Sequence, residues 1–218
     1  MKKKLIIALA LLVLFSTYQP QELFFKNKLN IKEIKIENNF ILKDKRIKEE
    51  LAFLYDINLI FLQTFDIEKK LKKLDFIESF EIKKIYPNKL KITIYEKKPI
   101  AILQYKRKKF YLSENLELIP YIYLENFKNL PLVLGNKKSF KTLYKELKKI
   151  NFPLDLIVSY YFYESKRWDL EISEKVIIKL PSKNYVPSLI NFISLRKNNN
   201  FDKYKIFDYR INDQLILK

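Results

Sequence analysis

Few side chains in this sequence could carry out metal or covalent chemistry. The chain has no cysteine, no histidine and one glycine, Gly135. Zinc, iron–sulfur and copper sites, and nucleophiles that depend on a thiolate or an imidazole, are therefore excluded. A glycine-rich phosphate loop is excluded as well. We expect no metal, no cofactor and no enzymatic activity.

Two weaker arrangements of reactive groups remain. Ser194 and Lys197 match a serine-x-x-lysine pattern, but two common residue types meet that pattern by chance in a lysine-rich chain. Asp208 and Glu171 could form an acid–base pair, although carboxylates on strands are mostly solvated. Both arrangements are better explained as surface side chains.

Arginine is much rarer than lysine in this chain, and two arginines lie beside apolar or aromatic residues. Arg167 precedes Trp168, and Arg210 precedes Ile211. A guanidinium can bind a carboxylate through two parallel hydrogen bonds. From residue type alone, both arginines are equally well explained as solvated surface cations, and Trp168 as part of the core.

The net charge suggests partners of a different kind. Lysine and arginine total 43 against 25 acidic residues, a formal charge of +18, and such an excess is typical of proteins that bind nucleic acid or anionic membranes. Here the lysines are dispersed, which argues against nucleic acid. The lysines at positions 69, 70, 72 and 73 are either solvated or in contact with anionic lipid headgroups.

The N-terminus has the pattern of a membrane segment. Lysines at positions 2–4 precede an apolar run over residues 5–15. This run is shorter than the roughly 20 residues that a full span needs, so a signal peptide is the alternative. Bulky residues follow it, and no small-residue cleavage site is present. We expect a cytoplasmic tail at 1–4 and an uncleaved single-pass anchor at 5–20, with the remaining chain in the periplasm.

The apolar pattern in the next part of the chain predicts a small α+β domain. Ile34 and Ile36 alternate with charged residues, and two helical patterns follow, with apolar residues at 47, 51 and 54 and then at 67, 71 and 74. Two further alternating stretches flank the turn at 86–89. The order β-α-α-β-β predicts a domain at 30–103 with two helices packed on a three-stranded sheet.

Short strands dominate the rest of the sequence. Strand patterns occur at 102–105, 110–112, 116–119, 132–134, 157–162, 168–172, 176–180, 206–209 and 215–217. Helical patterns follow Ser139 and Tyr185. Residues 104–218 are therefore expected to form a second α+β domain, a mostly antiparallel sheet with packed helices.

Several motifs in order resemble one protein family. They are the strand Ile34–Phe40, the pair Asn58-Leu59, the aromatic-proline-asparagine turn at Tyr86, and the closing Glu96-x-x-Pro99-x-Ala101. Together with Leu130 to Gly135, Arg167-Trp168 and Asp208 to Arg210, these motifs resemble the FtsQ/DivIB family of bacterial cell-division proteins. The chain departs from the family at Asp75-Phe76, where proline and tryptophan are usual, and in its very short tail.

The resemblance implies a POTRA domain followed by an FtsQ-type β domain. It also implies a non-enzymatic, bitopic inner-membrane scaffold at the division septum. Implied partners are FtsB and FtsL, together with proteins of the FtsK and FtsW/FtsI types. Partner binding would occur by strand addition at the C-terminal sheet, with contacts from Arg167, Trp168, Arg210, Ile211, Leu215 and Leu217. An outer-membrane assembly or secretion partner is the alternative, and a nucleic-acid binder is disfavoured.

Overall fold

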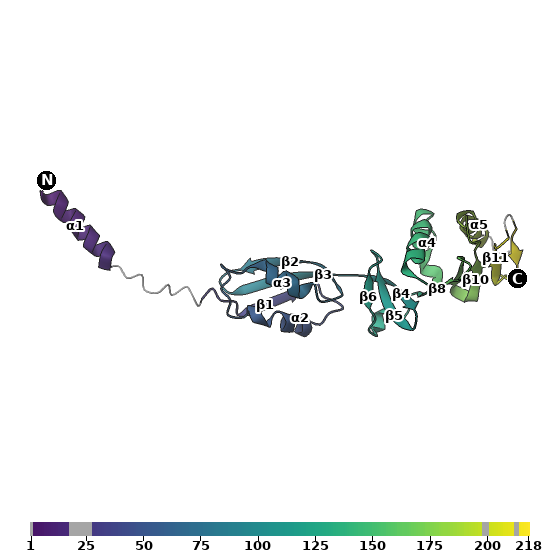
Figure 1. Cartoon of the computed structure of the whole chain (residues 1–218), viewed down its shortest axis with the longest axis horizontal. Coiled ribbons are helices and arrows are strands. Elements are labelled where there is room, and N and C mark those ends of the chain that lie inside the picture. Colours follow the sequence, from purple (N-terminus) through teal and green to yellow (C-terminus); the bar gives the residue numbers. More distant parts are fainter. Residues whose placement is uncertain (1, 18–27, 198–200, 212–213) are drawn as a thin grey trace. The chain divides into compact units, whose positions relative to one another are not determined.

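The computed structural model describes residues 2–17, 28–197, 201–211 and 214–218. The described chain divides into two compact units, residues 1–96 and residues 97–218 (Figure 1). Met1 of the expected tail, residues 18–20 of the expected anchor, and Asn212-Asp213 lie outside the described residues.

The N-terminal apolar segment is a helix, α1 (Lys2–Thr17). It begins within the lysines that were expected to form a tail. Among the residues that the structure describes, no helix is both long enough and apolar enough to cross a membrane. The span expected at 5–20 therefore stays a prediction.

The first unit has the expected order of elements. It consists of β1 (Glu33–Glu37), α2 (Asp44–Glu50), a 3-10 turn (Ala52–Leu54), α3 (Thr64–Leu71), β2 (Ile77–Ile85) and β3 (Lys89–Glu96). The strands form a sheet in the order β1-β3-β2, with β1 parallel and β2 antiparallel to the central β3.

The apolar periodicity of this unit corresponds to its core. Ile34, Ile36, Leu90, Ile92 and Ile94 are buried on one side of the sheet, where they meet the buried faces of the helices. The second element is shorter than the expected helix, because α2 stops at Glu50 and the 3-10 turn continues from Ala52. Leu51 and Leu54 are nevertheless buried, so the change of helix type keeps the apolar face on the core.

A carboxylate closes this unit after β3. Glu96 accepts hydrogen bonds from the backbone N–H groups of Phe40, Ile41 and Leu42, at 2.9, 2.8 and 2.7 Å. Backbone donors in a loop are costly to leave unpaired. One side chain at the end of β3 therefore satisfies the loop that joins β1 to α2.

The second unit is built on one large sheet. Its strands are β4 (Pro99–Tyr105), β5 (Lys108–Ser113), β6 (Leu118–Pro120), β7 (Leu132–Leu134), β8 (Ile157–Phe162), β9 (Trp168–Ile172), β10 (Val176–Lys179), β11 (Ile206–Asp208) and β12 (Ile216–Leu217). Over the described residues their order is β12-β11-β10-β9-β8-β7-β4-β5-β6. The β10-β11, β4-β7 and β7-β8 pairs are parallel, and the other neighbouring pairs are antiparallel.

Two helices, α4 (Lys137–Lys149) and α5 (Val186–Arg196), pack on this sheet (Figure 1). Phe140 of α4 contacts Tyr160 and Trp168, and Phe192 of α5 contacts Phe207. Close packing explains why position 135 is a glycine, because a Cβ there would lie 2.8 Å from the Cβ of Phe162. The helix-bearing face of the sheet is thus the core of the second unit.

The division between the units differs from the expected boundary at 103 and 104. The structure places it between Glu96 and Lys97. The reason is that β4 pairs with β5 and β7 and so belongs to the second sheet from its first residue, Pro99. Alternating apolar residues alone do not indicate which of two sheets a strand joins.

Candidate partner-binding site

The last strand of the chain lies at an edge of the large sheet. β12 pairs only with β11 among the described strands, through the positions Phe207 with Leu217 and Asp208 with Ile216. Lys218 donates to the carbonyl of Ile206 at 3.1 Å and accepts from its N–H at 2.9 Å. Because hydrogen bonding alternates along an antiparallel strand, the N–H and C=O of Leu217 face away from β11. Among the described strands, none pairs with this side of β12.

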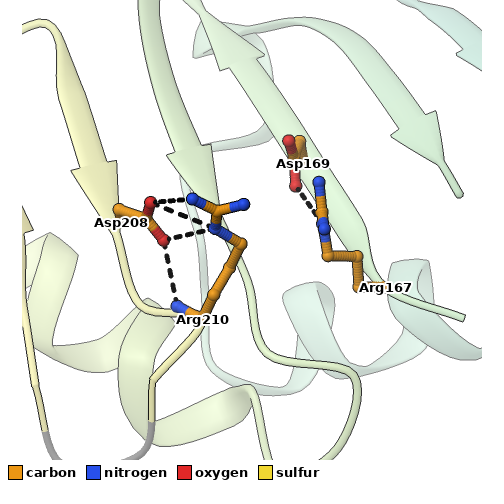
Figure 2. Close-up of polar contacts among 4 residues, drawn as sticks. All are labelled: Arg167, Asp169, Asp208 and Arg210. Atoms are coloured by element: carbon orange, nitrogen blue, oxygen red, sulfur yellow. Dashed lines mark hydrogen bonds and ion pairs between the residues drawn. The ribbon is translucent and has the colours of Figure 1, made fainter. Parts of the chain in front are cut away.

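An ion pair fixes the side chain of Arg210 next to β11, the strand that neighbours this edge strand. Its Nε donates to Asp208 Oδ1 at 2.8 Å and its Nη2 donates to Oδ2 at 2.6 Å (Figure 2). The Asp208 side chain is 7% exposed and that of Arg210 is 44% exposed. Hydrogen bonds from Arg210 hold the pKa of Asp208 below its usual range, although burial opposes this shift. The arginine is therefore anchored while part of it stays accessible.

A second pair lies on the same face, two strands away. Arg167 Nε donates to Asp169 Oδ1 at 3.3 Å (Figure 2), and its guanidinium lies 4.5 Å from the ring centre of Tyr163. Burial raises the pKa of Asp169, and the charge of Arg167 only partly offsets this effect. Lys179 of β10 is in register with both Asp169 and Asp208. The row across β9, β10 and β11 thus alternates in sign.

A surface hollow of about 780 Å³ lies next to the end of the chain. Ile211, Gln214 and Leu215 line it from the C-terminal segment, and Tyr209 lines it from the end of β11. The opposite wall comes from α5 and the loop before it, namely Pro181, Lys183, Asn184, Pro187, Ser188 and Asn191. The hydroxyl of Tyr209 donates to Asn191 Oδ1 at 2.8 Å, which ties the two walls together.

The predicted site residues fall into two groups. Leu217 belongs to the edge strand, Ile211 and Leu215 line the hollow next to it, and Arg210 follows β11, whereas Arg167 and Trp168 lie at the start of β9. Ile211 is 53% exposed, whereas Leu215 and Leu217 are half-buried against the core. Trp168 is 4% exposed and packs on Phe140 and Phe162. Its position along β9 turns it to the helix-bearing face, and its expected contact with a partner stays a prediction.

Sequence reasoning missed the carboxylates that hold the two arginines and the wall that α5 contributes. Asp169 and Asp208 each lie two residues from their arginine. Because side chains at i and i+2 share a face of a strand, this spacing could have predicted both pairs. The α5 wall leaves no comparable signal, since its residues meet the C-terminal segment only in the fold.

Comparisons with known proteins agree with this architecture. Residues 29–97 match the family described as POTRA domain, FtsQ-type. The chain is 29% identical over 182 residues to the cell division protein FtsQ of Rickettsia typhi, covering 79% of this chain and 68% of that protein. FtsQ of Agrobacterium fabrum is 21% identical over 161 residues, covering 73% and 51%.

A solved structure is also similar, namely the major extracytoplasmic domain of the cell division protein DivIB from Geobacillus stearothermophilus, in its trans isomer. The match has 12% identity and a TM-score of 0.34, and it covers 49% of this chain and 96% of that one. Residues 29–97 match the FtsQ-type POTRA domain family, and the chain is similar in sequence to FtsQ cell-division proteins.

Proposed function

We propose that this protein acts in bacterial cell division as a non-enzymatic scaffold of the inner membrane. It recruits and links other division proteins at the septum, with FtsB and FtsL as direct partners and proteins of the FtsK and FtsW/FtsI types as further ones. The N-terminal helix anchors it as a single-pass protein, and both folded units lie in the periplasm. Its FtsQ relatives support the division role.

The open edge of β12 is the observation that carries the proposed mechanism. An exposed strand edge invites pairing, and natural proteins cover or block such edges unless they use them. A partner segment that adds beside β12 gains backbone hydrogen bonds with Leu217, which supply affinity. Specificity comes from the side chains nearby, where the hollow lined by Ile211 and Leu215 accepts an apolar residue. Arg210, anchored by Asp208, faces a partner carboxylate.

Substitutions at Leu217 test strand addition directly. Proline at position 217 removes an N–H that faces the open edge, and proline is tolerated on edge strands. Leu217→Ala is the matched control, because it shortens the same half-buried side chain and keeps the N–H. Tagged full-length proteins are purified from membranes, and co-purified proteins are identified by mass spectrometry.

The expected result is that Leu217→Ala retains a small bitopic division partner and Leu217→Pro loses it. Equal recovery with both variants would show that the edge is not where the partner docks. Recovery of outer-membrane assembly or secretion components from the unmodified protein would instead favour the alternative role of POTRA-containing proteins.

A further inference from the structure

One end of the POTRA domain displays a cluster of apolar side chains to solvent. We call it the hairpin-end patch and define it as Ile60, Phe61, Phe65, Ile85 and Tyr86. Phe61 is 76% exposed and Phe65 is 68% exposed, while the other members are exposed by 37–59%. The proposed scaffold mechanism, which uses the far end of the chain, assigns no role to these side chains.

Hydrogen bonds bring the segments of the patch together. The start of β1 is in register with the start of β3, which places the β2–β3 turn beside residues 32 and 33 (Figure 1). Lys84, at the end of β2, donates from Nζ to the carbonyl of Leu62 at 3.3 Å, next to Phe61. Leu59 donates to the carbonyl of Leu29 at 2.9 Å. The patch therefore lies at the end of the domain where the chain arrives from α1.

Cationic side chains surround the patch. Lys28, Lys32, Lys83 and Lys89 are exposed at this end, and Lys84 is half-buried. The carboxylates here are Asp56, Asp66 and Glu33, and Glu33 is paired with Lys89 at 2.7 Å. Lysines thus outnumber carboxylates around an exposed group of aromatic and branched aliphatic side chains.

We propose that the hairpin-end patch docks on the surface of an anionic lipid bilayer. Phenylalanine and isoleucine gain from burial at the boundary between headgroups and acyl chains, and tyrosine is enriched at that depth. The surrounding lysines attract anionic headgroups. The apolar helix α1 precedes the domain in the sequence, and the chain that follows α1 enters the domain at the end that carries the patch. The inference rests on the proposed anchoring by α1.

The absence of cysteine from the chain makes a clean test possible. Gln63→Cys places one labelling site between Phe61 and Phe65, at an exposed residue outside the patch. Phe40→Cys is the matched control, because Phe40 is 83% exposed and lies at the opposite end of the sheet, beside Glu96. Each full-length protein carries a polarity-sensitive fluorophore and is reconstituted with vesicles of phosphatidylcholine and phosphatidylglycerol that contain spin-labelled lipid.

The proposal predicts a blue shift and lipid quenching of the label at 63, and neither for the label at 40. Phe61→Ser with Phe65→Ser should abolish the quenching at 63, whereas Phe40→Ser in the same labelled protein should not. Vesicles of phosphatidylcholine alone should give weaker quenching.

Other results would overturn the inference in distinguishable ways. If the protein floats with the vesicles but the label at 63 remains in water, the patch does not touch lipid, and anchoring by α1 still stands. Equal quenching at 63 and 40 would show that the domain has no preferred end. If the protein fails to float, the proposed anchoring fails, and lipid docking fails with it.

Discussion

Asp208 accepts hydrogen bonds from both the guanidinium and the backbone N–H of Arg210, two residues further along the chain. The arginine is therefore held beside β11, one strand in from the edge of the sheet, before any partner arrives. A side chain that is already ordered loses less conformational entropy on binding than a free one. This pre-organisation is consistent with a docking role for the edge.

Neutralising Asp208 should cost more stability than neutralising Asp169. The pKa of Asp208 is lowered by Arg210, so its ionised form stabilises the fold above the pKa of an unfolded carboxyl, and this contribution is lost as pH falls through its folded pKa. The pKa of Asp169 is raised by burial, so ionisation of Asp169 opposes folding, and this cost is relieved as pH falls. Asp208→Asn should cost roughly 1 to 3 kcal/mol at neutral pH, and Asp169→Asn should cost less.

Denaturant unfolding at neutral pH and at about the pKa of a free carboxyl, near 4, checks both directions. The difference between the Asp208→Asn variant and the unmodified protein should shrink in acid. A larger loss of stability from Asp169→Asn than from Asp208→Asn would contradict the assignment of the two pKa shifts.

The apolar patterns of the sequence predicted the helices and strands of this fold better than they predicted which strands lie side by side. The alternation at Ile34 and Ile36 and the helical spacing of Ile67 and Leu71 correspond to buried faces in the structure. The sheet order was not accessible in the same way, because β4 pairs with β7 across the intervening β5 and β6. Such long-range pairing depends on the whole apolar surface of the sheet.

The candidate site, too, could be predicted only in part. The sequence pattern predicted a strand at 215–217, and among the described strands β12 lies at an edge of the sheet. Which face each side chain takes was harder to predict. Trp168 and Asp169 are neighbours in sequence but lie on opposite faces of β9, and the register that decides this is set by the pairing with β8 and β10.

Removal of the Glu96 carboxylate should loosen the POTRA domain. Glu96→Ala leaves the N–H groups of Phe40, Ile41 and Leu42 without their acceptor, which should cost roughly 2 kcal/mol. Glu49→Ala is the control, since the Glu49 side chain is 64% exposed and its contact with Lys45 spans 3.9 Å; a change below about 0.5 kcal/mol is expected. Hydrogen exchange at residues 40–42 should accelerate in the Glu96 variant alone. Unchanged exchange there would mean that the carboxylate does not hold the loop.

A charge in the middle of α1 should release the protein from the membrane. Leu9 is 64% exposed on the helix, and arginine in the middle of a membrane helix costs about 2.5 to 3.5 kcal/mol on insertion. Leu9→Arg should therefore move protein from the carbonate-resistant membrane fraction to the supernatant. Ser16→Arg, near the end of the helix, should have little effect. Mass spectrometry of the extracted protein should find an intact N-terminus, and a mature terminus anywhere in residues 16–29 would contradict the uncleaved anchor.

Ile211, in the hollow beside β12, should contribute to binding of the partner and not to the stability of the fold. Ile211 is 53% exposed and lines the hollow, so Ile211→Ser should change the free energy of unfolding by less than about 0.5 kcal/mol. An apolar contact that anchors a partner typically contributes more than about 1 kcal/mol. Partner affinity should consequently fall by roughly fivefold to tenfold.

The chain offers a closely matched control for this change. Ile190, on α5, is 52% exposed and is not among the residues that line the hollow. Ile190→Ser removes the same side chain at nearly the same exposure, so it should leave partner affinity unchanged. Affinities are measured by titrating the full-length protein, in detergent, with the small bitopic partner recovered from membranes. Similar losses of affinity with both variants would indicate a general effect of surface hydrophobicity. No loss with Ile211→Ser would show that the hollow is not part of the docking surface. The β12 edge would then still be tested by the Leu217 variants.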